Sequence, residues 1–329
     1  MKGTEYRDLT LAQIADKLSQ PQPTVILMHV SPDGDAVGSA FALACWLRAK
    51  GSPAYCLCAE EIPARLRFLL GDEQESLLLS SLPQGFEEAR VVTVDVASPM
   101  QLGSLWEVFG ERISLEIDHH ERGTRYADGI VQGCAATGEL IYELFALSAT
   151  EISARAAELM YAALTTDTGG FRYSNTTPET HLRAAKLLAC GIDAANLNHL
   201  LLEVKSKEIL SAEAAGYSLM QTYADGRVAI IPFDFEQKTR LGLENEHLST
   251  LVDVARKLAG VQIAVAIRQP DAQSVFRVSM RASIDFDVSA VCATFGGGGH
   301  PRAAGATLTA YKTIEQATAA VLREIEARL

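Results

Sequence analysis

The chain has 329 residues, of which 48% are hydrophobic and 21% charged, and its formal net charge at pH 7 is −12. This length exceeds what one hydrophobic core usually serves, so it predicts two domains, and the hydrophobic share excludes a disordered chain. The acidic balance argues against a broad basic surface for long nucleic acid, but it does not exclude small anionic substrates, because bound divalent cations would reverse the local charge.

The first two-thirds of the chain alternates strand and helix patterns. Near-continuous apolar runs, typical of parallel strands covered on both faces, occupy residues 24–30, 53–58, 90–96 and 112–118. Helical patterns occupy residues 36–50, 135–147, 153–164 and 177–189. This alternation predicts an α/β fold with a parallel sheet for an N-terminal domain over residues 1–195.

The remainder of the chain has a different character. Residues 196–220 are polar with little turn chemistry, which predicts one long connector helix. Residues 221–329 predict a smaller α+β domain, with strands over 227–233, 261–269 and 274–283 and helices over 247–259, 288–294 and 313–329. Its one compositional anomaly is a run of four glycines, Gly296–Gly299.

Histidines and aspartates concentrate in four short segments of the N-terminal domain. Three of the segments follow predicted strands, and the fourth follows a predicted helix. They are HVSPDGDAVGS with His29, Asp33 and Asp35, VVTVDVAS with Asp95, LEIDHH with Asp118, His119 and His120, and LTTDTGGF with Asp167. The carboxyl ends of parallel strands meet at one sheet edge, so we expect these side chains to lie together.

A cluster of this composition predicts a metal centre. Closely packed carboxylates repel one another unless cations lie among them. Mixed Asp and His ligands suit Mn²⁺, Mg²⁺, Co²⁺ or Zn²⁺ and exclude a thiolate site. Taken singly, Asp33 in a turn or Asp35 at a helix start has a structural explanation. That explanation weakens when all four segments occupy matching positions in the fold.

The segments resemble a known family. HVSPDGDA, VVTVDVAS, IDHH and TTDTGGF resemble the four motifs of the DHH phosphoesterase family. FGGGGHPRAAG resembles the signature of the DHH-associated C-terminal domain, so the resemblance covers about residues 20 to 308. It implies two metal ions held by six side chains: His29 and Asp33 for the first, Asp35, His119 and Asp167 for the second, and Asp95 for both.

The resemblance also implies catalytic roles for three residues. Asp95 would bridge the ions, Asp118 would orient His119, and His120 would face the substrate phosphate. The implied cofactor is a pair of Mn²⁺ ions, with Mg²⁺ or Co²⁺ as alternatives.

The C-terminal domain carries the predicted substrate residues. Four glycines leave backbone N–H groups free to bind an anion, and Arg302 can bind a phosphate through two hydrogen bonds. A flexible loop is the structural alternative. The strand SVFRVSMRAS alternates, which places Ser279 and Arg281 on one face. The resemblance places six residues against the nucleotide: Ser279, Arg281, Gly298, Gly299, His300 and Arg302.

Two further positions of the chain bear on substrate binding. The family often has serine where this chain has Ala282, which removes any serine contact there. Arg172 follows two glycines near Asp167, where a phosphate contact and a surface salt bridge are alternatives.

Within the family, the chain most resembles the bifunctional oligoribonucleases and 3′-phosphoadenosine 5′-phosphate (pAp) phosphatases, called nanoRNases. The resemblance implies short oligoribonucleotides and pAp as substrates, with a metal domain and a substrate domain facing across a cleft. It implies no long nucleic acid and no membrane partner, and it is compatible with a homodimer. Two alternatives stay open: a phosphodiesterase for linear dinucleotides such as pGpG or pApA without pAp phosphatase activity, and a regulatory nucleotide-binding module with a dead site.

The cysteines and the N-terminus bear on location. Six scattered cysteines form no CxxC pair, which predicts buried free thiols in a reducing compartment. The first residues contain no signal-peptide apolar region, and the longest apolar runs are too short to span a bilayer. We therefore expect a cytoplasmic protein.

Overall fold

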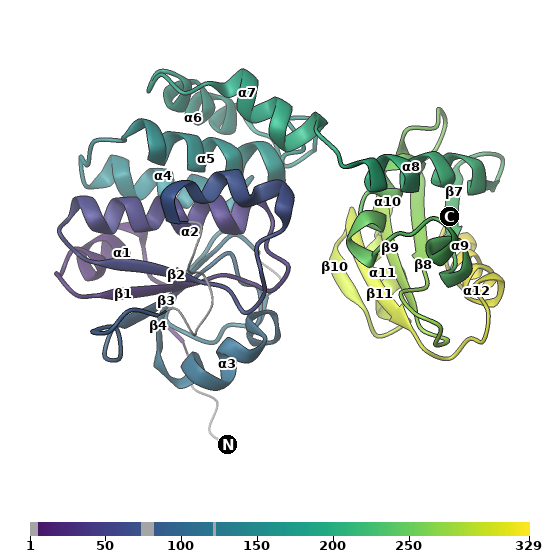
Figure 1. Ribbon diagram of the computed structural model, residues 1–329, viewed down its shortest axis with the longest axis horizontal. Coiled ribbons are helices and arrows are strands. Elements are labelled where there is room, and N and C mark those ends of the chain that lie inside the picture. The colour runs from purple at the N-terminus through teal and green to yellow at the C-terminus, as the bar shows by residue number, and fades with distance from the viewer. Residues whose placement is uncertain (1–5, 74–81, 121–122) are drawn as a thin grey trace. The chain divides into compact units, whose positions relative to one another are not determined.

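Figure 1 shows the computed structural model, which describes residues 6–73, 82–120 and 123–329. The chain divides into two units, Met1–Val204 and Lys205–Leu329. Each unit has its own sheet and its own hydrophobic cores. The α/β fold class predicted from the sequence is confirmed.

The N-terminal unit is built on a five-stranded sheet in the order β2-β1-β3-β4-β5. Every pairing in it is parallel. The strands are β1 (Thr24–Leu27), β2 (Ala54–Leu57), β3 (Arg90–Val94), β4 (Ile113–Asp118) and β5 (Gly129–Val131). The four predicted strands are therefore all present, with shorter bounds, and β5 is an additional short strand.

Helices cover both faces of this sheet, as continuous apolar strands predict. Alternate residues such as Val25 and Ile26 enter opposite cores. One face packs against α1 (Leu11–Leu18), α2 (Gly34–Ala49), α4 (Thr137–Leu147) and α5 (Ala154–Asp167), and the other against α3 (Ser104–Phe109). The unit also contains α6 (Pro178–Leu188), η1 (Ala64–Glu73), η3 (Pro99–Leu102) and η4 (Gly110–Arg112).

Helices α2 and α5 pack closely because α2 carries glycine where they meet. A Cβ on Gly34 would lie 2.3 Å from Thr166 Cγ2, and one on Gly38 would lie 2.4 Å from the Leu159 carbonyl oxygen. Helix α5 also continues three residues beyond its predicted end, so that Asp167 is its last residue. The N-terminus of α2 and the C-terminus of α5 are thereby held side by side.

The predicted single connector helix over residues 196–220 is wrong. The structure has α7 (Ala194–Asn198), one turn of π-helix η5 (His199–Glu203) and then α8 (Lys207–Leu219). Val204 is extended at φ −69° and ψ 124°. Ser206 is also extended, and its side chain accepts a hydrogen bond from Ile209 N, which starts α8 as a new helix. The polar composition of the segment did not distinguish a continuous helix from a capped break.

The C-terminal unit has a six-stranded mixed sheet in the order β10-β11-β9-β8-β7-β6. Only β7 and β8 pair in parallel. The strands are β6 (Gln221–Tyr223), β7 (Val228–Phe233), β8 (Ile263–Arg268), β9 (Phe276–Ala282), β10 (Gly298–His300) and β11 (Ala303–Leu308). The last two glycines of the Gly296–Gly299 run thus belong to an edge strand.

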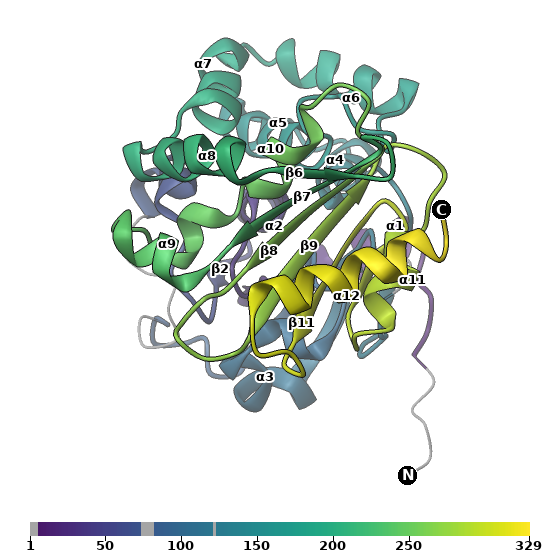
Figure 2. The same ribbon diagram turned by 90° about the vertical axis from the view of Figure 1, so that its right-hand side faces the viewer.

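Helices lie on both faces of the second sheet. On one face lie α11 (Val288–Ala293) and α12 (Ile314–Glu326), and α12 crosses the strands in the foreground of Figure 2. On the other face α8 and α10 (Leu251–Arg256) pack against β7 and β8. The unit also contains α9 (Phe235–Arg240) and η6 (Asn245–Leu248). The predicted helix over 247–259 is therefore two shorter elements.

Other expectations concern the cysteines and the membrane. All six cysteines are free thiols, of which Cys56, Cys58 and Cys292 are buried and the others are partly exposed. Among the described residues, no helix combines the length and the apolarity that crossing a bilayer requires. The cytoplasmic location stays a prediction.

Candidate metal centre

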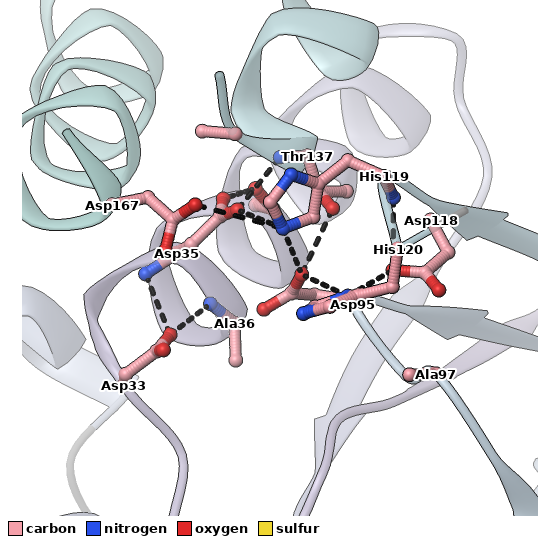
Figure 3. A network of polar contacts seen from close by, with 12 residues as sticks. Asp33, Asp35, Ala36, Asp95, Ala97, Asp118, His119, His120, Thr137 and Asp167 are labelled. Carbon is pink, nitrogen blue, oxygen red and sulfur yellow. Dashed lines mark hydrogen bonds and ion pairs between the residues drawn. The ribbon is translucent and has the colours of Figure 1, made fainter. Parts of the chain in front are cut away.

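The carboxyl ends of three neighbouring strands place the predicted residues together. His29 follows β1, Asp95 directly follows β3, and Asp118 closes β4 ahead of His119 and His120. Asp33 and Asp35 lie at the start of α2, and Asp167 lies at the end of α5. Figure 3 shows the side chains of Asp35, Asp95, His119 and Asp167 pointing toward one another.

The first group of donors comprises His29, Asp33 and Asp95. The Nε2 atom of His29 lies 3.9 Å from Asp33 Oδ1 and 3.7 Å from Asp95 Oδ2. The other ring nitrogen, Nδ1, donates to the Val30 carbonyl oxygen at 2.7 Å. This hydrogen bond leaves the Nε2 lone pair facing the two carboxylates.

The second group comprises Asp35, His119 and Asp167, and like the first it combines one histidine with two aspartates. The Nε2 atom of His119 lies 3.9 Å from Asp35 Oδ2 and 3.6 Å from Asp167 Oδ2. Its Nδ1 donates to the Cys134 carbonyl oxygen at 3.1 Å. Again a backbone carbonyl fixes the tautomer and leaves Nε2 toward the acids.

Asp95 faces both groups. Its Oδ2 is the oxygen near His29, whereas its Oδ1 lies 3.6 Å from His119 Nε2. The Asp95 backbone has φ 59°, in the left-handed region that aspartate and asparagine tolerate better than most residues. This conformation turns the side chain into the centre of the cluster, where its two oxygens can serve two ions.

The donor set fits divalent cations. The nitrogen–oxygen distances of 3.6–3.9 Å are too long for hydrogen bonds but suit atoms that share an ion. Burial, followed by repulsion from Asp95 and Asp167, raises the pKa of Asp35 well above its ordinary value. Burial and then repulsion from Asp33 and Asp95 do the same to the pKa of Asp167. Cations would remove this repulsion, and imidazole with carboxylate suits Mn²⁺, Co²⁺ or Zn²⁺.

The N-terminus of α4 anchors the cluster, which sequence reasoning missed. Asp35 accepts hydrogen bonds from Thr137 N at 2.6 Å, Gly138 N at 3.0 Å and Ser39 Oγ at 2.7 Å. The Thr137 hydroxyl donates to Asp95 Oδ1 at 2.9 Å. The available signal was a threonine in the first turn of a predicted helix, a position that binds anions through free N–H groups.

Asp118 has a different partner from the one that the resemblance implies. Its Oδ1 accepts a hydrogen bond from His120 Nδ1 at 2.8 Å, and it contacts His119 only through the backbone N–H, also at 2.8 Å. In extended backbone, residues two apart point the same way, so Asp118 and His120 share a side and His119 points away. The expectation that Asp118 orients the His119 ring is therefore corrected. Burial lowers the pKa of His120, but the bond to Asp118 and the negative charges of Asp95, Asp118 and Asp167 together outweigh burial and raise the pKa to about 9.

Four of the six predicted substrate residues of the C-terminal unit share one sheet face. Strand pairing puts Ser279, Arg281, Gly298 and His300 on one sheet face, while Gly299 pairs with Ala304 in the opposite orientation. The guanidinium of Arg302 instead binds the Ile284 carbonyl oxygen and lies 3.4 Å from Asp285 Oδ1.

Arg172, in the N-terminal unit, donates from Nε to the Gly169 carbonyl oxygen, within its own loop. The phosphate contacts of Arg302 and Arg172 stay predictions.

Two family models match the chain. The model described as the DHH family, N-terminal domain, matches residues 23–164, and the DHHA1 domain matches residues 227–327. The chain is also 32% identical over 311 residues to the bifunctional oligoribonuclease and PAP phosphatase NrnA of Thermus thermophilus, an alignment that covers 93% of this chain and 90% of that protein. The chain belongs to the DHH family.

Two further proteins are similar to the chain. The Bacillus subtilis protein of the same name is 27% identical over 301 residues, which cover 88% of this chain and 90% of that one. A crystal structure of an exopolyphosphatase-related protein from Bacteroides fragilis superposes with a TM-score of 0.86 at 24% identity, covering 96% of this chain and 95% of that one. The latter similarity shows that the two proteins share a fold.

Proposed function

We propose that this DHH protein is a metal-dependent phosphoesterase that hydrolyses oligoribonucleotides of about two to four nucleotides to mononucleotides, and pAp to AMP and phosphate. The observation that carries the proposal is the position of Asp95, whose two carboxylate oxygens each face a different histidine–aspartate group. The names of the relatives from Thermus thermophilus and Bacillus subtilis support the same two activities.

We propose His29, Asp33, Asp35, Asp95, His119 and Asp167 as the ligands of two Mn²⁺ ions, with Mg²⁺ or Co²⁺ as substitutes. Bound ions of this kind supply the Lewis acidity and the activated water that phosphoester hydrolysis requires. The chain itself holds the carboxylates in place. Thr137, Gly138 and Ser39 bind Asp35, and the Thr137 hydroxyl binds Asp95.

The pair of His120 and Asp118 would act on the substrate side of the reaction. Because Asp118 accepts the Nδ1 proton of His120, the imidazole is fixed in orientation and its positive charge is stabilised. A positive ring beside the metal cluster can bind the anionic scissile phosphate and stabilise the charge that develops on it. In the C-terminal unit, Ser279, Arg281, Gly298, Gly299 and His300 would bind the rest of the nucleotide.

The alternative of a phosphodiesterase for linear dinucleotides differs only in lacking pAp hydrolysis. A dead regulatory module would not need an intact set of six facing donors, so the geometry favours an enzyme.

The deciding experiment uses the full chain, stripped of metal and reloaded with Mn²⁺. Phosphate release from pAp and product formation from labelled oligoribonucleotides of graded length are measured against the Asp95→Asn variant. Hydrolysis of neither substrate by the Mn²⁺-loaded wild type would contradict the proposal.

A further inference from the structure

The loop before α4 and the first turn of that helix, residues 134–138, hold two ligands of the second donor group. The Cys134 carbonyl oxygen accepts the Nδ1 proton of His119 at 3.1 Å. Two backbone N–H groups at the start of α4 bind Asp35 at 2.6 and 3.0 Å. The third ligand of the group, Asp167, belongs to a different element, because it is the last residue of α5. The second donor group is therefore complete only if residues 134–138 and the end of α5 keep their spacing.

The side chain of Asn175 joins these two parts of the chain. Its Nδ2 donates to the Ala135 carbonyl oxygen at 2.9 Å and to the Asp167 carbonyl oxygen at 3.1 Å. Both acceptors are backbone carbonyls, so only the amide nitrogen, which carries two protons, can serve both. The last carbonyl groups of a helix have no partner inside the helix, which leaves that of Asp167 available. One side chain thus connects the backbone of one ligand to the segment that holds the other two.

The loop that follows α5 is folded so that Asn175 reaches the end of this helix. Phe171 has a φ of 62°, which is unusual for a bulky residue. Its N–H donates to Thr168 Oγ1 at 2.9 Å, and its ring stacks on His181 with a centroid distance of 5.2 Å. Backbone strain of this kind persists where surrounding contacts enforce it, and it is concentrated at functional sites. Here the turn returns the chain to α5, so that Asn175 lies against Asp167, eight positions earlier.

The first donor group is held by other contacts. Nδ1 of His29 donates to the Val30 carbonyl oxygen at 2.7 Å. Asp33 is the N-cap of α2 and accepts two backbone N–H groups, each at 3.0 Å. These bonds are all made within residues 29–36, so none of them passes through Asn175. Loss of the Asn175 contacts should therefore affect one donor group and spare the other.

We propose that Asn175 is a positioning residue that holds the second donor group in the geometry that binds one of the two metal ions. The inference rests on the proposed function, because it takes the cluster as a two-ion centre. Bonds within one short stretch of chain hold the ligands of the first ion. A bond between the end of α5 and the loop before α4 holds those of the second ion, which is accordingly the ion that depends on Asn175.

The test counts the Mn²⁺ ions that the full chain, stripped of metal, binds in equilibrium dialysis. We expect wild type to bind two ions. Asn175→Ala should bind one ion with wild-type affinity and the other about tenfold to a hundredfold more weakly, as is usual when a residue that orients metal ligands is lost. In electron paramagnetic resonance, the Mn²⁺ signal of a coupled pair should give way to that of a single ion.

A second variant tests the same contact without changing the shape of the side chain. Asn175→Asp places an oxygen where the Nδ2 donor lies, and this oxygen cannot donate to the two carbonyl groups. It should therefore weaken the same ion. This variant also decides the question if Asn175→Ala does not fold.

The matched control is Asn198→Ala. Nδ2 of Asn198 donates to the Tyr161 hydroxyl at 3.3 Å, away from the ligand backbone that Asn175 binds. Both asparagines are partly exposed, and each has a buried Oδ1 without a partner among the described residues. The two alanine substitutions therefore remove the same kinds of atom. We expect Asn198→Ala to bind both ions as wild type does.

Melting temperatures of the metal-free chains separate positioning from a general loss of stability. A general loss should lower the melting temperature and weaken both ions together, whereas positioning affects one ion. Equal weakening of both ions, two ions bound to Asn175→Ala with wild-type affinity, or the same loss in Asn198→Ala would overturn the inference and leave the proposed function in place. A wild type that binds fewer than two ions would instead contradict the proposed two-ion centre, and the inference with it.

Discussion

The Thr137 hydroxyl donates to Asp95 Oδ1 at 2.9 Å, which ties the first turn of α4 to the centre of the carboxylate cluster. We expect Thr137→Val, which keeps the shape but removes the hydroxyl, to weaken Mn²⁺ binding and activity about tenfold to a hundredfold, as is usual for residues that orient metal ligands. Thr137→Ser restores the hydroxyl and should recover most of both. A Mn²⁺ titration followed by pAp hydrolysis measures the effect, and wild-type metal affinity in Thr137→Val would contradict it.

Asp95 should be the most sensitive single ligand, because it faces both donor groups. Asparagine is the informative replacement, since it tolerates the left-handed φ of 59° and removes only the charge. We expect kcat/KM of Asp95→Asn to fall by more than about a hundredfold, beyond the usual effect of residues outside the ligand set. Metal content by mass spectrometry and pAp hydrolysis are the measurements. A near-normal rate of pAp hydrolysis would show that Asp95 does not bridge the two metal ions.

Metal removal should affect stability as well as activity. Without cations, Asp35 and Asp167 repel Asp95 in a buried cluster, so binding of Mn²⁺ to the folded state should stabilise it. At a hundred times the dissociation constant, the gain is about 2.7 kcal/mol. We expect excess EDTA to abolish hydrolysis and to lower the melting temperature, and Mn²⁺ to restore both. Full activity in EDTA would exclude a metal-dependent reaction.

Arg281 and Arg302 should differ in what they contribute. Arg281 is partly exposed on the sheet face that also carries Ser279 and His300, so Arg281→Ala should raise KM and lower kcat/KM about tenfold to a hundredfold, with metal content unchanged. Arg302 binds the Ile284 carbonyl oxygen, so Arg302→Ala should instead lower the free energy of unfolding by about 1 kcal/mol and affect kcat/KM less. Kinetics and urea unfolding of both variants decide between them. A larger loss of kcat/KM in Arg302→Ala than in Arg281→Ala would instead support the predicted contact between Arg302 and a phosphate.

Substrate length should have an optimum. Each added nucleotide needs its own contact to increase affinity, and proteins that follow long strands supply basic grooves and stacked aromatics. This chain has 29 Lys and Arg against 41 Asp and Glu and only 7% aromatic residues. We expect kcat/KM to be highest for about two to four nucleotides and to fall for longer strands. A rate that rises steadily to about twenty nucleotides would indicate a processive exonuclease with a basic track.

The sequence alone determined the α/β class and which residues would meet in the cluster. Apolar runs predicted the four main strands of the N-terminal sheet, and parallel strands bring their carboxyl ends to one edge regardless of details. His29, Asp95 and His119 follow such strands, so the parallel topology alone places these three residues at one edge of the sheet. The DHH motifs then supplied the order of the ligands.

The orientation of the side chains was decided by tertiary structure. Whether Asp118 binds His119 or His120 depends on which way the backbone turns after β4, and spacing does not contain that information. Thr137 reaches Asp95 only because α4 begins next to α2 in space. Arg268 and Arg281 are 13 positions apart in the chain and share a face only through the register of β8 and β9. Register and helix packing follow from long-range burial of apolar surface, which local sequence patterns do not encode.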